Sequence, residues 1–192
     1  MANLIEPFAG PHAEAVAARL LQRFGSLHRA LVSPDDDDGP AEDAAVLRQV
    51  RAARKLVLEA SREEIARQPV SPGDAGLHEY LKGLLGDQPN EVLHAVFVDR
   101  HHGYIADERV SSGSPSRISG STRHLLTRAF ELGARGLILA HNHPSGCARP
   151  SQCDIETTAR IREVTAELEL ALLDHLIVTR RAVFSFRAGG LL

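Results

Sequence analysis

An apolar run leads directly into polar and turn-forming residues in the stretch Leu137-Ile138-Leu139-Ala140-His141-Asn142-His143-Pro144-Ser145-Gly146. A short apolar run bounded by turn residues predicts a buried β-strand, and Pro144 and Gly146 bend the chain after it. Side chains two positions apart in a strand point to the same side, so His141 and His143 can converge on one point. Asn142 then faces the opposite way. The stretch therefore predicts a buried strand with two imidazoles at its end.

A carboxylate follows where it can join the two imidazoles. Pro150 precedes a helical pattern over residues 155–168, and the start of this helix presents Asp154. Two histidines and one aspartate supply three protein ligands, which leave a tetrahedral Zn²⁺ ion one open position for water. An open position distinguishes a catalytic zinc site from a closed structural one. The pattern therefore favours one catalytic zinc ion per chain.

Each part of this pattern also has a simpler interpretation. Two histidines at a strand end can be merely exposed or hydrogen-bonded, and Ser151 and Asp154 can cap the helix by binding its free backbone N–H groups. Cys147 and Cys153 lie in the same stretch. As a thiolate, either cysteine could supply a fourth ligand and close the site, whereas packing is the simpler role. The residues alone leave these alternatives open.

Strand patterns and helix patterns alternate through residues 73–192. This alternation predicts one compact domain of the mixed α/β (α+β) class. Asp174 and His175 interrupt an apolar β run, where they can support a ligand imidazole from behind or form a buried hydrogen-bonded pair. The expected strands cover residues 91–99, 104–110, 137–140, 170–179 and 182–186, the expected helices cover 74–85, 122–132 and 155–168, and a Ser/Gly loop covers 111–120.

Residues 1–72 are expected to form a separate small helical unit. Helical periodicity runs over residues 13–24 and 43–59. Ser61-x-x-Glu64 has the form of a capping box that opens a further short helix. The breaker-rich segment 69–73 then marks the boundary to the second domain, residues 73–192.

Composition places the chain among ordinary globular proteins. It has 192 residues, 43% of them hydrophobic and 24% charged, and its formal net charge of -3 does not indicate a nucleic-acid binder. No apolar stretch approaches the ~20 residues that a membrane helix needs. The start shows no basic segment followed by an apolar one, and two cysteines cannot make a disulfide framework. We therefore expect a cytoplasmic protein without a membrane partner. The sequence leaves open whether the chain forms a homo-oligomer.

The spacing of the candidate ligands resembles that of a known family. His141-x-His143, seven residues, Ser151, two residues and Asp154 is the spacing of the JAMM (MPN+) metallopeptidase motif. The sequence His-Asn-His-Pro-Ser-Gly is most similar to the motif of the bacterial RadC-like branch of this family. The resemblance runs from about residue 73 to residue 192. It implies an MPN/cytidine-deaminase-like three-layer core beside the small helical unit.

The resemblance also implies roles for individual residues. The zinc ligands that it implies are His141, His143 and Asp154. The family's motif serine, which steadies the oxyanion of the tetrahedral intermediate, corresponds to Ser151. The family uses an upstream glutamate as general base, for which Glu91 at the first expected strand is the candidate and Glu108 on the next strand is the fallback. These roles predict a zinc-dependent hydrolase that cleaves amide or isopeptide bonds with a metal-activated water.

The alternative function is a non-catalytic RadC-like module that binds a protein or DNA partner. RadC-like proteins often carry an N-terminal helix-hairpin-helix region, and residues 20–32 resemble its first half. The glycine-rich second half is replaced by Asp35–Asp38, whose charge repels a phosphate. DNA binding is therefore disfavoured, and the expected partner is a peptide or an isopeptide-linked protein substrate.

Overall fold

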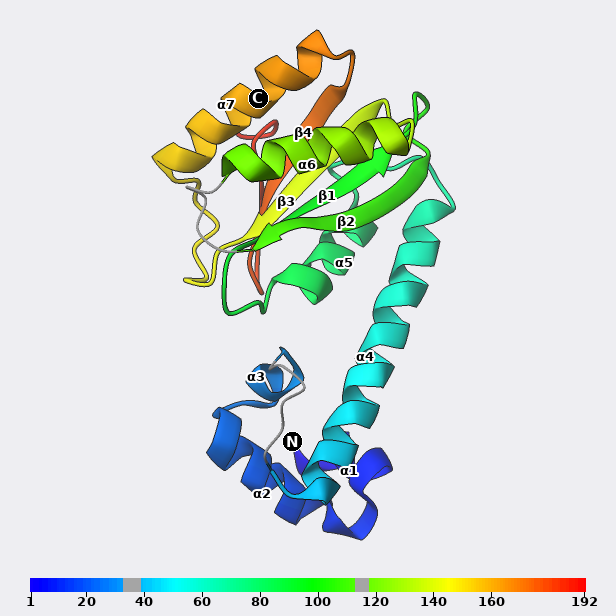
Figure 1. Cartoon of the computed structure of the whole chain (residues 1–192). Helices are drawn as coiled ribbons and strands as arrows, with labels where there is room; N and C mark the ends of the chain where they lie inside the picture. Colours follow the sequence, from blue (N-terminus) through cyan, green and yellow to red (C-terminus); the bar gives the residue numbers. More distant parts are fainter. Residues whose placement is uncertain (33–38, 113–117) are drawn as a thin grey trace. The chain divides into compact units, whose positions relative to one another are not determined.

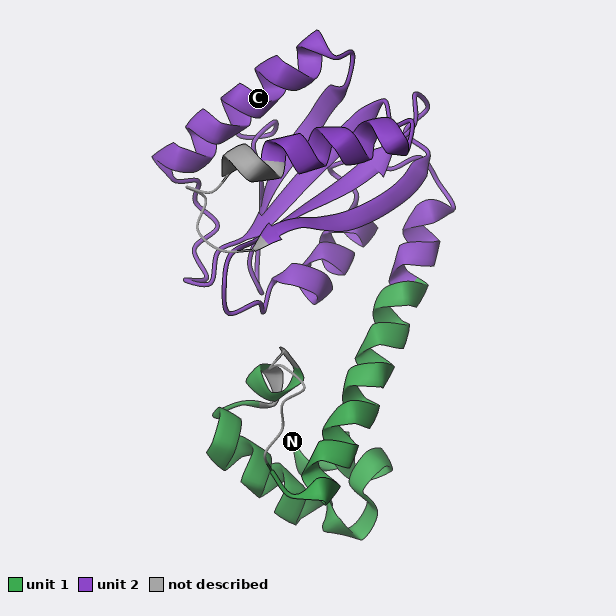
Figure 2. Ribbon diagram, viewed as in Figure 1, with its two compact units in different colours: residues 1–60 green, residues 61–192 purple. Residues whose placement is uncertain are grey.

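The structure, a computed structural model, describes residues 1–32, 39–112 and 118–192. The chain forms two compact units, Met1–Ala60 and Ser61–Leu192, which are coloured separately in Figure 2. They divide within the long helix α4 (Ala41–Ala66), upstream of the predicted boundary between residues 72 and 73. The domain boundary between residues 72 and 73 stays a prediction. In the ranges that the structure describes, no helix is both long and apolar enough to cross a bilayer.

Unit 1 is a group of helices around one apolar core. Its fully buried side chains include Val16, Leu20 and Leu47. The predicted helix over residues 13–24 is α2, and Gly25, in the left-handed conformation with φ 73°, ends it. The acidic segment Asp35–Asp38 lies outside the described residues. The elements of the unit are α1 (Ala2–Ala9), the short 3-10 helix η1 (Gly10–His12), α2 (Ala13–Phe24), α3 (Leu27–Val32) and the first part of α4.

One prediction for α4 is wrong. Ser61-x-x-Glu64 does not open a new helix, because α4 continues through both residues to Ala66. A serine inside a helix costs less than ~1 kcal/mol relative to alanine, and its neighbours here are mostly alanine, arginine and glutamate, which favour helix. A capping pattern without a preceding break in helical periodicity therefore does not end a helix.

Unit 2 is built on a five-stranded mixed sheet (Figure 1). The strand order is β2-β1-β3-β4-β5; β3 and β4 are parallel, and the other neighbours are antiparallel. All seven residues of the central strand β3 are buried. The predicted mixed α/β class is confirmed. The strands are β1 (Val92–Val98), β2 (Tyr104–Ser112), β3 (Gly136–Asn142), β4 (Ala171–Val178) and β5 (Val183–Ser185).

Helices cover both faces of the sheet and give the unit three layers (Figure 1). α6 (Ile118–Glu131) and α7 (Gln152–Glu167) lie on one face, where Leu125 and Ile161 share an apolar core with Leu137 and Leu139. α5 (Ala75–Leu85) contacts β3 and β4 from the other face. The expected loop over 111–120 is shortened from both ends by β2 and α6, and residues 113–117 lie outside the described residues.

The connection from β3 through α7 to β4 positions the histidine pair. Adjacent parallel strands need a crossover, so the chain must cross the sheet between the end of β3 and the start of β4. α7 makes this crossover. The end of β3 and the first turn of α7 therefore meet at the carboxyl end of the central strand, which is a usual place for ligand sites in α/β sheets.

Candidate metal centre

Both histidines of the His-x-His pair face the start of α7. His141 lies on the same face of β3 as Leu137 and Leu139, whose side chains pack beneath α6 and α7. His143 follows the strand by one residue, and its backbone N donates a 3.2 Å hydrogen bond to the carbonyl of Val178. This bond keeps the chain beside β4. The convergence of the two rings follows from strand alternation, as the sequence predicts.

Asn142 faces the opposite way and fastens the end of β3 to the segment that leads into β1. The backbone N of Val92 donates to Asn142 Oδ1 over 2.8 Å. Asn142 Nδ2 donates to the carbonyls of Gln88 and Asn90 over 3.2 and 3.1 Å. The side chain is buried and uses one acceptor and two donor positions. The residue between the two imidazoles therefore anchors them to the sheet.

Asp154 is held by the first turn of α7. Its Oδ2 accepts hydrogen bonds from the backbone N and the hydroxyl of Ser151, over 2.8 and 2.7 Å. In return, the backbone N of Asp154 donates to Ser151 Oγ over 3.2 Å. This is a capping box at the N-terminus of α7. It fixes the carboxylate in the direction of the histidine pair.

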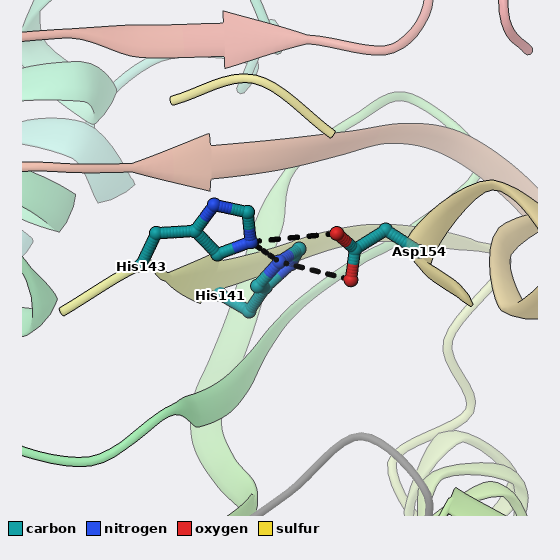
Figure 3. Close-up of side chains that lie close together, drawn as sticks. All are labelled: His141, His143 and Asp154. Carbon is teal, nitrogen blue, oxygen red and sulfur yellow. Dashed lines mark hydrogen bonds and ion pairs between the residues drawn. The ribbon is translucent and has the colours of Figure 1, made fainter. Parts of the chain in front are cut away.

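The three side chains meet at one point, as Figure 3 shows. Nε2 of His141 lies 2.9 Å from Nε2 of His143. Asp154 Oδ1 lies 3.3 Å from the first nitrogen, and Asp154 Oδ2 lies 3.4 Å from the second. A tetrahedral zinc ion with bonds of about 2.1 Å spaces its ligand atoms about 3.4 Å apart. Each nitrogen lies at about that spacing from its nearer carboxylate oxygen, and the distance between the two nitrogens is shorter by about half an ångström.

Burial and charge make the site attractive to a cation. Burial lowers the pKa of His141 to about 4, although the carboxylate of Asp154 opposes this shift. Burial raises the pKa of Asp154, but the two hydrogen bonds from Ser151, together with the neighbouring imidazoles, outweigh this effect, so that pKa is lowered. At neutral pH an uncharged His141 ring therefore faces an ionised carboxylate. Imidazole nitrogens and a carboxylate are usual ligands of divalent transition metals, and this group could bind such an ion.

Comparison with known proteins identifies the family of the chain. A family model described as the RadC-like JAB domain matches residues 72–191. The chain belongs to this family. The match covers the sheet, its three helices and the candidate metal centre.

Several bacterial proteins resemble most of the chain, so the similarity extends beyond the RadC-like JAB domain into unit 1. A UPF0758 protein of Burkholderia thailandensis is 37% identical over 183 residues, which cover 92% of this chain and 68% of the relative. A UPF0758 protein of Burkholderia mallei is 37% identical, with 92% of this chain and 64% of the relative covered. A UPF0758 protein of Rhodobacter capsulatus is 35% identical, with 92% and 84% covered. The chain thus spans about two thirds of the length of these Burkholderia relatives.

The two glutamates considered as general base differ in their surroundings within the RadC-like JAB domain. Leu93 of β1 pairs with His141, so the same register continued by two residues puts Glu91 opposite His143. Glu108 lies on β2 and pairs with Ala95 instead. Its carboxylate accepts hydrogen bonds of 2.9 and 3.1 Å from Arg128 on α6, which lower its pKa. Glu91 therefore stays the preferred candidate, and Glu108 is engaged in an ion pair.

The serine and the two cysteines of the motif stretch have defined surroundings. The hydroxyl of Ser151 takes part in the capping box, as the simpler interpretation holds, and its oxyanion role stays a prediction. Cys147 and Cys153 are exposed free thiols. Cys147 contributes its carbonyl, which accepts a 2.8 Å hydrogen bond from Nδ1 of His143. Among the described residues, the group of converging ligands that contains His141 includes neither thiol.

Thr158 on α7 and the pair Asp174 and His175 on β4 lie behind the candidate metal centre. His175 Nε2 lies 2.8 Å from His141 Nδ1, which confirms the expected contact behind the His141 ring. Asp174 does not bind the His175 ring; its carboxylate accepts from the backbone N atoms of His175 and Arg187, over 2.7 and 3.0 Å. Thr158 also contacts His175 and was not predicted, because a threonine in a helix gives no signal of a distant partner.

Proposed function

We propose that this chain is a metal-dependent hydrolase that uses zinc to cleave amide or isopeptide bonds. The observation that carries the proposal is the convergence of His141 Nε2, His143 Nε2 and a carboxylate oxygen of Asp154 at one point. Three ligands of this kind leave a tetrahedral ion one free coordination position, which hydrolytic zinc sites use for water. Membership of the RadC-like JAB family adds support, and so does the spacing of the motif, which resembles that of JAMM metallopeptidases.

The chemistry divides between the ion and the chain. A bound zinc ion lowers the pKa of water towards ~7 and polarises a substrate carbonyl. Glu91 is proposed to accept the proton of the attacking water and to deliver it to the leaving nitrogen. This role needs the carboxylate of Glu91 within hydrogen-bond reach of that water, and the β1–β3 register supports such a position.

Ser151 is proposed to donate a hydrogen bond to the developing oxyanion. Its hydroxyl and its backbone N both donate to Asp154 Oδ2. If the hydroxyl rotates towards the substrate, the backbone bond still holds the carboxylate. The capping box is therefore compatible with a second use of the same hydroxyl.

The proposed substrate is a peptide or an isopeptide-linked protein. A cytoplasmic location is part of the proposal and agrees with the two free thiols. The non-catalytic alternative, a module that binds a protein or DNA, makes a different prediction: stoichiometric metal binding without turnover of any peptide or isopeptide.

The experiment combines metal analysis with hydrolysis assays. Protein purified without added zinc is expected to contain one zinc ion per chain and to hydrolyse members of a panel of peptides and isopeptides. Glu91→Gln is expected to keep the metal and to lower turnover by at least ~100-fold, the usual contribution of a general base. Glu108→Gln, which removes a carboxylate from the neighbouring strand, is the matched control and is expected to keep its turnover. Turnover that survives Glu91→Gln would eliminate the proposed mechanism.

A further inference from the structure

A chain of three short contacts connects the two metal-ligand elements behind the metal centre. His141 Nδ1 lies 2.8 Å from His175 Nε2. His175 Nδ1 lies 2.6 Å from Thr158 Oγ1, and Thr158 Oγ1 lies 2.6 Å from the backbone carbonyl of Asp154. All four residues are buried. The contacts therefore run without solvent from one ligand ring, through β4 and α7, to the main chain of another ligand.

The backbone carbonyl of Asp154, at the end of this series of contacts, determines where each proton lies. A carbonyl oxygen accepts hydrogen bonds only, so the single hydroxyl proton of Thr158 points to Asp154. The contact between Thr158 and His175 then needs a proton from the ring, which places that proton on His175 Nδ1. His175 Nε2 is thereby an acceptor, and the proton of the last contact lies on His141 Nδ1. His141 Nε2 is left with a free lone pair facing the metal centre.

A second carbonyl fixes the other ligand ring in the same way. His143 Nδ1 donates to the carbonyl of Cys147, so in the uncharged ring His143 Nε2 also bears a free lone pair. The two bare nitrogens lie 2.9 Å apart beside the Asp154 carboxylate. Two lone pairs at this distance repel each other unless they share a cation. The hydrogen-bonded surroundings of both rings thus favour a cation at the place where the ligands converge.

His175 is itself held in one orientation. Its ring stacks on Phe186, with 4.9 Å between the ring centroids and 19° between the planes. Its backbone N donates to Asp174 Oδ1, and its carbonyl accepts from the backbone N of Phe186. The stacking fixes the plane of the ring, and the contacts of Nδ1 with Thr158 and of Nε2 with His141 set which nitrogen faces which partner.

We propose that His175 and Thr158 are positioning residues that fix His141 as the Nδ1–H tautomer and so keep His141 Nε2 free to bind the metal ion. The inference rests on the metal-binding part of the proposed function and does not depend on hydrolysis. Neighbours that orient a ligand imidazole typically change metal affinity 10–100-fold when they are removed.

The first test measures the tautomers in the metal-free protein. Nitrogen-15 NMR of the histidine rings is expected to show Nδ1–H tautomers for His141, His143 and His175, with a coupling across the hydrogen bond between His141 and His175. In Thr158→Val, part of the His141 population is expected to move to the Nε2–H tautomer. An Nε2–H tautomer of His141 in the unsubstituted chain overturns the inference. A change of packing alone does not alter which nitrogen bears the proton.

The second test measures zinc affinity by competition with a chromogenic chelator. Thr158→Val is expected to weaken zinc binding at least ~10-fold, and Thr158→Ser, which keeps the hydroxyl, is expected to restore it. Thr165→Val is the matched control, because Thr165 is buried on the same helix and its hydroxyl donates to the local carbonyl of Arg162. Equal losses in Thr158→Val and Thr165→Val contradict the inference.

Replacement of His175 separates its hydrogen bond from its packing. His175→Gln offers an amide oxygen to His141 Nδ1 and is expected to bind zinc more tightly than His175→Phe, which keeps an aromatic ring but accepts no hydrogen bond. The reverse order overturns the inference. If the unsubstituted chain binds no zinc, the proposed function fails, and the NMR measurement still decides the tautomer of His141.

Discussion

Replacement of Asn142 by alanine tests how the metal centre depends on the sheet beneath it. Asn142 lies between His141 and His143, but its side chain points away from them. It accepts from the backbone N of Val92 and donates to the carbonyls of Gln88 and Asn90. Asn142→Ala removes these three hydrogen bonds and leaves a buried N–H group without its acceptor. We expect this single change to destabilise unit 2.

The magnitude follows from the three bonds. A buried hydrogen bond contributes about 1 kcal/mol net, so the loss of three lowers the free energy of unfolding by about 3 kcal/mol. With a urea dependence of about 2 kcal/mol per molar, the midpoint of unfolding falls by about 1.5 M. Asn90→Ala is the matched control, because Asn90 is exposed and its substitution is expected to change the free energy by no more than about 0.5 kcal/mol.

The two tyrosines of the chain provide a selective assay. The sequence contains two tyrosines and no tryptophan. Tyr80 and Tyr104 both belong to unit 2, so tyrosine fluorescence in urea follows that unit alone. A midpoint for Asn142→Ala within about 0.3 M of the value for Asn90→Ala, which corresponds to roughly 0.6 kcal/mol, would refute the reasoning.

Three further outcomes follow from other contacts. The carboxylate of Asp107 accepts hydrogen bonds from Tyr80 and Tyr104, and its pKa is lowered because the hydrogen bonds from His94 and Tyr104 outweigh the effect of burial. A carboxylate whose pKa is lowered by folding stabilises the fold above pH ~3.9, and this stabilisation is lost as the pH falls further. The urea midpoint between pH 3 and pH 6 should therefore depend less on pH in Asp107→Asn than in the unsubstituted chain. Burial and Asp107 raise the pKa of both tyrosines well above the usual range, so an absorbance titration of the folded protein should show no phenolate at pH ~10. Ser151→Ala removes the capping hydroxyl of α7 and should lower the free energy of unfolding by about 1 kcal/mol in urea titrations; a change below about 0.3 kcal/mol would show that the cap does not stabilise the helix.

Local rules account for the parts of the structure that the sequence predicts. Alternation along β3 places His141 and His143 on one face, and the start of a helix places Asp154 next to them. Both rules involve residues close together in the chain. The predicted break at Ser61 is wrong because two local signals compete there, and the helical propensity of the surrounding residues outweighs the capping pattern.

The remaining contacts of the site depend on tertiary structure. Asn142 binds the backbone of Val92, which lies 50 residues away. Thr158 meets His175 across 17 residues, and only the pairing of β3 with β4 brings His175 behind His141. The sequence marks His175 as unusual in an apolar strand, but a threonine on a helix has no such mark. The convergence of His141, His143 and Asp154 is therefore predictable from one sequence, and the contacts behind it are not.

X-ray absorption spectroscopy of the zinc-loaded protein tests the central claim most directly. The claim is that His141, His143 and Asp154 hold one metal ion and leave a coordination position free. We predict one zinc ion per chain, two imidazole ligands and only nitrogen or oxygen neighbours at about 2.0–2.1 Å. A sulfur neighbour at about 2.3 Å, which Cys147 or Cys153 would supply, contradicts the account, as does the absence of stoichiometric zinc.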